Sequence, residues 1–284
     1  MFLRRIGYIY RRCSLRRELS RRHAFRVTNC SELELFVVGG TAQDRFEITT
    51  ALRRAHVPAI VESMEHDFGY APPYHLKIIA IYTPDSDEFC RLARFLGQPN
   101  PDGLPGLYAG RFGAVLLLGP AATDAFLVLL LHEMTHAVAH ARYGALGMYW
   151  AIEGFAELLT RQFASEAGIL RPREQDRAFL ALYRDNPRLS LHEVVSMREL
   201  EYEALDSVSA FCFHMFSLLL TRYLLDEHEC SGCLRSLWCR AVLRGFDPPE
   251  LFGRELTAVA GVTLAHVEQQ IVKNLKEGMN RATT

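Results

Sequence analysis

The sequence predicts an α+β protein with strands and helices in its first half and mostly helices in its second half. Two observations predict this class. Short runs rich in β-branched and other apolar residues lie before residue 120, and apolar residues at helical spacing dominate after it. Of the 284 residues, 49% are hydrophobic and 23% are charged. This balance is typical of a folded domain and argues against a disordered chain, a collagen-like repeat and a polytopic membrane protein.

The first half contains three candidate strand regions, each bounded by turn-forming residues. They span residues 33–38, 76–82 and 107–118, and the last fits either two short strands or one strand with a glycine bend. Apolar residues at helical spacing occupy residues 42–66 and 85–96. Pro58 predicts a kink or a split in the first of these helices, and Asp85 or Ser86 can cap the second. We therefore expect a small mixed β-sheet accompanied by helices.

The second half is predicted to begin with a long helix, capped at Thr123 or Asp124 and ended by Gly144. Further helical periodicity covers residues 149–163, 205–225, 234–243 and 264–275. Residues 164–200 are charged and are interrupted by Pro172 and Pro187. We expect one domain over residues 29–284, with the sheet and the first long helix in residues 29–143 and a helical part in residues 144–284.

Residues 1–28 are predicted to form a basic N-terminal arm; the alternative is a solvated basic first helix. Nine arginines but one acid, Glu18, occur in the first 26 residues, although the whole chain has a net charge of −1. The arginines interrupt every apolar run, so the segment lacks the pattern of a secretory signal. With no signal peptide or transmembrane helix evident, we expect a cytoplasmic location. We expect weak contact of the arm with membrane surfaces and no specific nucleic-acid partner.

Residues 131–136 (Leu-His-Glu-Met-Thr-His) have the composition of a metal site. On an α-helix, residues four apart lie one above the other, so His132 and His136 project from one face and can bind one Zn²⁺. Glu133 lies on the neighbouring flank, where its carboxylate can approach a water molecule without binding the metal. This is the HExxH arrangement of zinc hydrolases, in which the glutamate is the general base.

The third ligand is predicted in the segment Trp-Ala-Ile-Glu-Gly-Phe-Ala-Glu, residues 150–157. Glu153 follows His136 by 17 residues, a distance that suits a second helix returning past the first. Gly154 is small enough to allow close helix approach. Glu157 lies one turn further on the same face, where it can accept a hydrogen bond from a ligating histidine. One Zn²⁺ with three protein ligands is therefore expected.

The two segments together resemble the gluzincin pattern of the peptidase MA clan, in which HExxH is followed by EGxAE. The resemblance implies a zincin-like fold, zinc ligation by His132, His136 and Glu153, and a general base at Glu133. It also implies an edge strand near residues 108–115 that pairs with an extended substrate.

The resemblance is incomplete at the position of a tyrosine that helps to stabilise the oxyanion in related proteins. Alignment places Asp206 there, so Tyr202, one turn earlier, and His214 are the candidates for this role. The sequence thus predicts a zinc-dependent metallopeptidase that hydrolyses peptide or protein substrates. Two alternatives stay open, namely a zinc hydrolase of a non-peptide amide and a non-proteolytic zinc-containing protein that binds through its basic arm.

Overall fold

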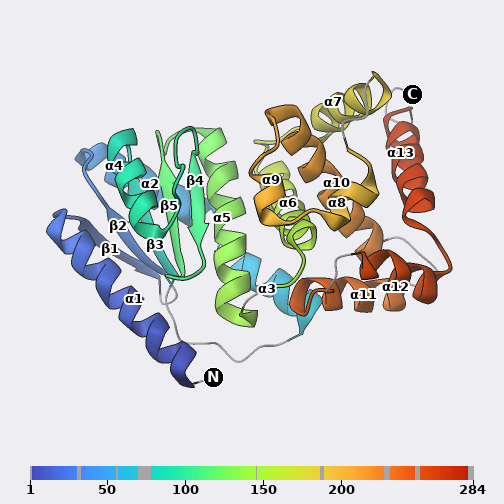
Figure 1. Cartoon of the computed structure of the whole chain (residues 1–284). Helices are drawn as coiled ribbons and strands as arrows, with labels where there is room; N and C mark the ends of the chain where they lie inside the picture. Colours follow the sequence, from blue (N-terminus) through green and yellow to red (C-terminus); the bar gives the residue numbers. More distant parts are fainter. Residues whose placement is uncertain are drawn as a thin grey trace. The chain divides into compact units, whose positions relative to one another are not determined.

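The computed structural model describes residues 2–30, 33–55, 57–69, 78–144, 146–185, 189–226, 231–246 and 250–280. The chain divides into two compact units, Met1–Ala145 and Leu146–Thr284. The first unit contains a five-stranded sheet and its helices, and in the described part of the second unit every regular element is a helix (Figure 1). The α+β class expected from the sequence is confirmed.

The first unit alternates helices with the strands of one mixed sheet. In chain order its elements are α1 (Phe2–Arg21), β1 (Phe25–Cys30), β2 (Leu33–Val37), α2 (Ala42–Arg54), α3 (Val57–Phe68), β3 (Ile78–Thr83), α4 (Ser86–Leu96), β4 (Gly106–Ala109), β5 (Ala114–Leu118) and α5 (Asp124–Tyr143). The strand order is β1-β2-β3-β5-β4, with β2, β3 and β5 parallel. The two edge strands, β1 and β4, are antiparallel to their neighbours.

Helices cover both faces of this sheet, which explains why its central strands are apolar on both sides. Ile79 and Ile81 of β3 lie in a core cluster with residues of α1 and α4. Tyr82 faces the opposite side, where its ring contacts Phe126 of α5 edge-on. Every residue of β3 is buried. Burial of each large apolar side chain stabilises the fold by roughly 1.5–3 kcal/mol.

The N-terminal residues differ from the expected arm, because α1 packs within the first unit. Leu15 and Leu19 are fully buried in the same core cluster as the apolar residues of α4. Glu34, buried on β2, accepts hydrogen bonds from Arg16 (Nη2–Oε2, 2.5 Å) and Arg26 (Nη2–Oε1, 2.6 Å). The high arginine content obscures the two leucines, so composition alone favours a solvated segment where the structure has a packed helix.

The second unit consists of α6 (Tyr149–Glu166), α7 (Pro172–Asp185), α8 (Leu191–Ser196), α9 (Glu199–Tyr202), α10 (Ser207–Asp226), α11 (Ser231–Leu243), α12 (Leu251–Ala260) and α13 (Leu264–Asn280). Helices α6 and α10 pack tightly at Gly154. A Cβ atom on Gly154 would lie 2.2 Å from the carbonyl oxygen of Ser217 and 2.3 Å from Oγ1 of Thr221. The close helix approach expected at Gly154 is thus made to α10.

Helix α10 is the described helix that is long and apolar enough to cross a membrane, over Ser207–Leu225. Buried residues make up 72% of that stretch. A helix that is apolar around its circumference and buried is typical of the core of a helical domain. Its composition therefore follows from its packing in the second unit.

Candidate metal centre

The HExxH residues lie on α5, a helix with clear boundaries at both ends. Oγ1 of Thr123 accepts a hydrogen bond from the backbone N–H of Phe126, so Thr123 is the N-cap. At the other end, Gly144 has a φ of 86°, a conformation that glycine adopts readily. Both boundaries agree with the sequence prediction and set the middle turns of α5 at residues 132–136.

The two histidines of α5 converge on each other. Nε2 of His132 lies 3.0 Å from Nε2 of His136, and the two rings are nearly perpendicular. In a tetrahedral zinc site with Zn–N bonds of 2.0–2.1 Å, two ligand nitrogens lie about 3.3 Å apart. The observed separation is therefore close to that required by one shared metal ion.

Two ionisable side chains of α5 are largely withdrawn from solvent. Glu133 and His136 are each 9% exposed. A buried carboxylate is destabilising unless a hydrogen bond or an opposite charge compensates it. Burial of both groups among the apolar residues of α5 is therefore more typical of a functional site than of a packing core.

The second unit contributes a separate cluster of four predicted residues from three helices. Glu153 and Glu157 lie on α6, Tyr202 ends α9 and His214 lies on α10. Nδ1 of His214 is 3.2 Å from Oε1 of Glu157 and 3.9 Å from Oε2 of Glu153. Nε2 of the same ring is 2.8 Å from the hydroxyl of Tyr202. The close packing of α6 on α10 at Gly154 brings the acids to the histidine.

The chemistry of these neighbours determines how His214 interacts with Tyr202. Carboxylates only accept hydrogen bonds, so they favour a proton on Nδ1, and a neutral His214 then accepts from the Tyr202 hydroxyl at Nε2. When His214 is protonated, Nε2 donates instead, and the hydroxyl proton of Tyr202 becomes available to another acceptor.

Asp206, the residue that aligns with the tyrosine of related proteins, has a structural role. Its carboxylate accepts hydrogen bonds from the backbone N–H groups of Val208 and Ser209, both at 2.9 Å. The first N–H groups of a helix have no acceptor within the helix, so Asp206 caps the start of α10 by accepting from two of them. Tyr202, one turn earlier in the sequence, is the residue next to His214.

His132, His136 and Glu153 form a group that could hold a metal ion. His132 and His136 lie on α5 of the first unit, and Glu153 is buried on α6 of the second. Two imidazole nitrogens and one carboxylate oxygen form a ligand set suited to zinc, and three protein ligands leave a coordination position for substrate or water. The residues are the three that the sequence predicts as ligands.

A link between edge strand β4 and helix α5 could not be seen in the sequence. The hydroxyl of Tyr108 lies 2.6 Å from Nδ1 of His140, one turn beyond His136. Burial raises the pKa of Tyr108 well above its ordinary value and lowers the pKa of His140, so both are neutral near pH 7.

Of the expected edge region, residues 108–115, only Tyr108 and Ala109 belong to the edge strand; Ala114 begins β5.

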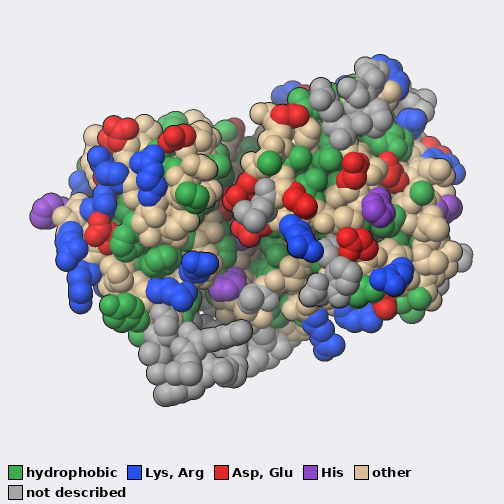
Figure 2. Space-filling view, viewed as in Figure 1, with side chains coloured by type: hydrophobic (Ala, Val, Ile, Leu, Met, Phe, Trp, Pro, Cys, Tyr) green, Lys and Arg blue, Asp and Glu red, His purple; other side chains and the backbone are tan. Residues whose placement is uncertain are grey.

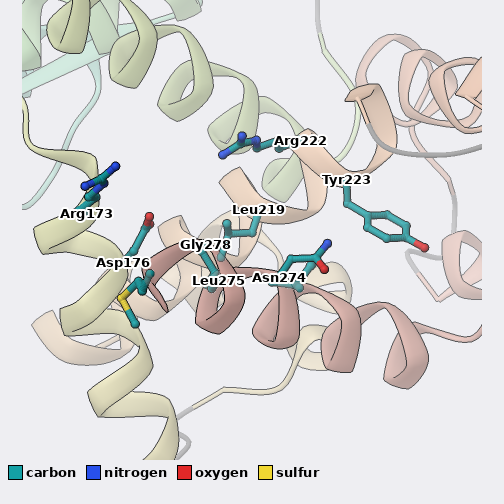
Figure 3. Close-up of a pocket in the computed structure, with 10 residues that line it drawn as sticks. Arg173, Asp176, Leu219, Arg222, Tyr223, Asn274, Leu275 and Gly278 are labelled. Atoms are coloured by element: carbon teal, nitrogen blue, oxygen red, sulfur yellow. The ribbon is translucent and has the colours of Figure 1, made fainter. Parts of the chain in front are cut away.

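A separate pocket of about 230 Å³ opens in the second unit (Figure 3). Arg173 and Asp176 project toward it from α7, and Leu219 and Arg222 from α10. Asp176 also accepts a hydrogen bond from Arg161 at 2.6 Å, which ties α6 to α7. None of the predicted site residues lines this pocket.

The sequence matches no protein family model and no curated protein. The function proposed below therefore depends on the chemistry of the residues described above.

Proposed function

We propose that this protein is a zinc-dependent metallopeptidase of the gluzincin type. The supporting observation is the histidine pair of α5, with Nε2 of His132 and Nε2 of His136 3.0 Å apart; Glu153 is the third ligand in this proposal. Imidazole nitrogens and a carboxylate oxygen suit zinc. Glu153 is only 7% exposed, and ligation of a cation would offset the cost of burying its charge.

Each surrounding side chain has a distinct task in the proposed reaction. When bound, zinc lowers the pKa of water and polarises a substrate carbonyl. Glu133 accepts the proton of the attacking water and delivers it to the nitrogen of the leaving amine. Tyr202 donates a hydrogen bond to the oxygen that becomes negatively charged, and its proton is available for this when His214 is protonated and donates to the Tyr202 oxygen from Nε2.

The sheet edge favours a peptide over a smaller amide as the substrate. Strand β4 pairs with β5 on one side and is the last strand of the sheet on the other. Its outer backbone groups can hydrogen-bond an extended peptide, which is a common mode of peptide recognition. The Tyr108–His140 hydrogen bond holds this strand against α5.

Metal content is the first test of this function. We expect about one zinc ion per chain in the purified protein. His132→Ala and Glu153→Ala should each lose it, and Glu133→Gln should retain it. His192→Ala, which alters an exposed histidine on α8, is the matched control and should bind zinc normally. A folded wild-type protein that takes up no zinc would refute the proposal.

Turnover is the second test, carried out on the zinc-loaded protein with a mixture of unstructured peptides. We expect cleavage by the wild type and none by zinc-loaded Glu133→Gln. Activity retained by that variant would remove Glu133 from the mechanism. Hydrolysis of small amides without any cleavage of peptides would favour the non-peptide alternative.

A further inference from the structure

The arginines of α1 and the residues after it fall into two sets, of which the first stabilises the fold. This set comprises Arg12, Arg16, Arg22 and Arg26. Arg12 is 4% exposed and donates a hydrogen bond to the Tyr8 hydroxyl. Arg16 and Arg26 pair with Glu34, and Arg22 pairs with Glu18 and Glu88. The packing of the first unit accounts for these four arginines.

The second set takes no part in that packing. Arg11, Arg17 and Arg21 are exposed. Arg11 and Arg17 form no ion pair with any residue that the structure describes, and Arg21 lies 3.8 Å from Glu18 with its side chain 71% exposed. At 100° per residue, Arg17 and Arg21 lie on the side of α1 opposite Leu15 and Leu19. The fold of the first unit does not require these positive charges.

Two apolar side chains are exposed on the same helix. Ile9 is 55% exposed and Tyr10 is 75% exposed, and Tyr10 shares the outward side with Arg17 and Arg21. Figure 2 shows Lys and Arg side chains gathered along α1, at the left of the view, with hydrophobic side chains beside them. Tyr10, Arg17 and Arg21 form the outer face of α1, and the exposed residues Ile9 and Arg11 flank it on either side; we use the name for all five.

We propose that the outer face of α1 binds the surface of a lipid bilayer that contains anionic lipids. Arginine binds phosphate and carboxylate groups through two parallel hydrogen bonds, which suits lipid headgroups. Tyrosine is favoured at the level of the headgroups, where its ring is buried and its hydroxyl is hydrated. The side chain of isoleucine cannot form hydrogen bonds with the phosphates or bases of a nucleic acid, but its burial among acyl chains is favourable. The combination therefore favours a membrane surface over a nucleic acid.

The expected binding is electrostatic and reversible. Each arginine close to an anionic membrane surface strengthens binding by about fivefold, so three contribute about a hundredfold. Added salt screens this attraction, because the Debye length falls to about 3 Å at 1 M salt. This property is independent of the proposed peptidase activity, since α1 supplies none of the proposed zinc ligands or catalytic residues.

Vesicle co-sedimentation of the full chain tests the proposal. We expect binding to vesicles of phosphatidylcholine mixed with phosphatidylserine, loss of binding in high salt, and little binding to phosphatidylcholine alone. The double variant Arg17→Glu/Arg21→Glu should bind more than about tenfold more weakly. The control Arg173→Glu/Arg177→Glu makes the same change in net charge on exposed residues of α7 and should bind like the wild type.

The apolar side chains and the fold have their own checks. Ile9→Ser/Tyr10→Ser should weaken binding while leaving the remainder sensitive to salt. Circular dichroism and thermal melting should show that the charge variants stay folded, since both arginines are exposed. If Arg17→Glu/Arg21→Glu does not fold, Arg17→Gln/Arg21→Gln is used in its place. Equal binding of the α1 and α7 variants would overturn the proposal. Tighter binding to RNA or DNA than to anionic vesicles, lost in the α1 variant, would also overturn it.

Discussion

The hydroxyl of Tyr202 lies 2.8 Å from Nε2 of His214, which joins the short helix α9 to the core helix α10. The opposite nitrogen of the same imidazole lies 3.2 Å from Glu157. An acid–histidine–tyrosine series of this kind couples the direction of the tyrosine O–H bond to the protonation of the histidine. The direction in which the Tyr202 hydroxyl can donate is therefore set by His214.

Tyr202→Phe should lower kcat of the proposed peptidase by about a hundredfold, the usual effect of removing one oxyanion donor. Zinc content should be unchanged, because Tyr202 is not a ligand. Steady-state kinetics and metal analysis on the same preparation measure both. Tyr183→Phe is the control, since it removes a hydroxyl that donates to Glu268 at 2.8 Å, and it should leave kcat unaltered. Equal kcat for the wild type and Tyr202→Phe would remove Tyr202 from the mechanism.

Gly154→Ala should destabilise the second unit by about 2 kcal/mol or more, the range of overpacked cores. The new Cβ would lie 2.2 Å from the Ser217 carbonyl oxygen, so α6 and α10 must move apart. Because Glu153 precedes the substituted residue, zinc affinity should fall as well. Chemical denaturation and metal titration measure the two effects.

Gly278→Ala is the control for this change. Gly278 lies within α13, and a Cβ there would meet no atom within 4 Å. Replacement of glycine by alanine inside a helix should stabilise it by up to about 1 kcal/mol. Equal stability of the two alanine variants would show that the α6–α10 contact is not tightly packed.

Glu34→Gln should reduce stability at neutral pH by about 2 kcal/mol, since it removes one partner of an ion-pair cluster whose arginines are half exposed. Burial raises the pKa of Glu34, but hydrogen bonding to Arg16 and the charges of Arg16, Arg26 and Arg12 lower it by more. The net effect is a pKa below the ordinary value of a glutamate.

The sign of that shift fixes the pH dependence. A carboxyl group with a depressed pKa in the folded state stabilises the protein above its unfolded-state pKa, and this contribution is lost as the pH falls through the folded-state pKa. The difference in unfolding free energy between the wild type and Glu34→Gln should therefore shrink as the pH falls below about 4. Urea denaturation across this range measures it. A difference that is constant with pH would mean that the charge of Glu34 does not contribute.

Leu15→Ala and Leu19→Ala should each destabilise the first unit by about 2–5 kcal/mol, because both side chains are fully buried. Arg17→Ala, between them in sequence but exposed, should change stability by less than about 0.5 kcal/mol. Thermal melting of the three variants separates the packing role of α1 from the surface role of its arginines. Little effect in both leucine variants would restore the interpretation of residues 1–28 as a solvated arm.

Elements with a strong local signal could be predicted from the sequence. Asp85 caps α4 and Thr123 caps α5, as the polar residues before each apolar periodic segment predict. The helix expected over residues 42–66 is divided near Pro58 into α2 and α3, in agreement with the split that this proline predicts. The prediction was incomplete in residues 164–200, where α7, α8 and α9 form although charged residues and prolines interrupt the pattern.

The spacing of the two histidines was enough to predict how they lie relative to each other. An i, i+4 spacing on any α-helix brings two side chains together, so His132 and His136 required only that α5 be helical. The tertiary structure decided the contacts between residues distant in sequence, such as Tyr202 with His214 and Tyr108 with His140. It also decided which arginines of α1 pair with buried acids and which face outward. These contacts form where different helices and strands pack against one another. Periodicity describes the residues within one element, so it does not show which elements pack together.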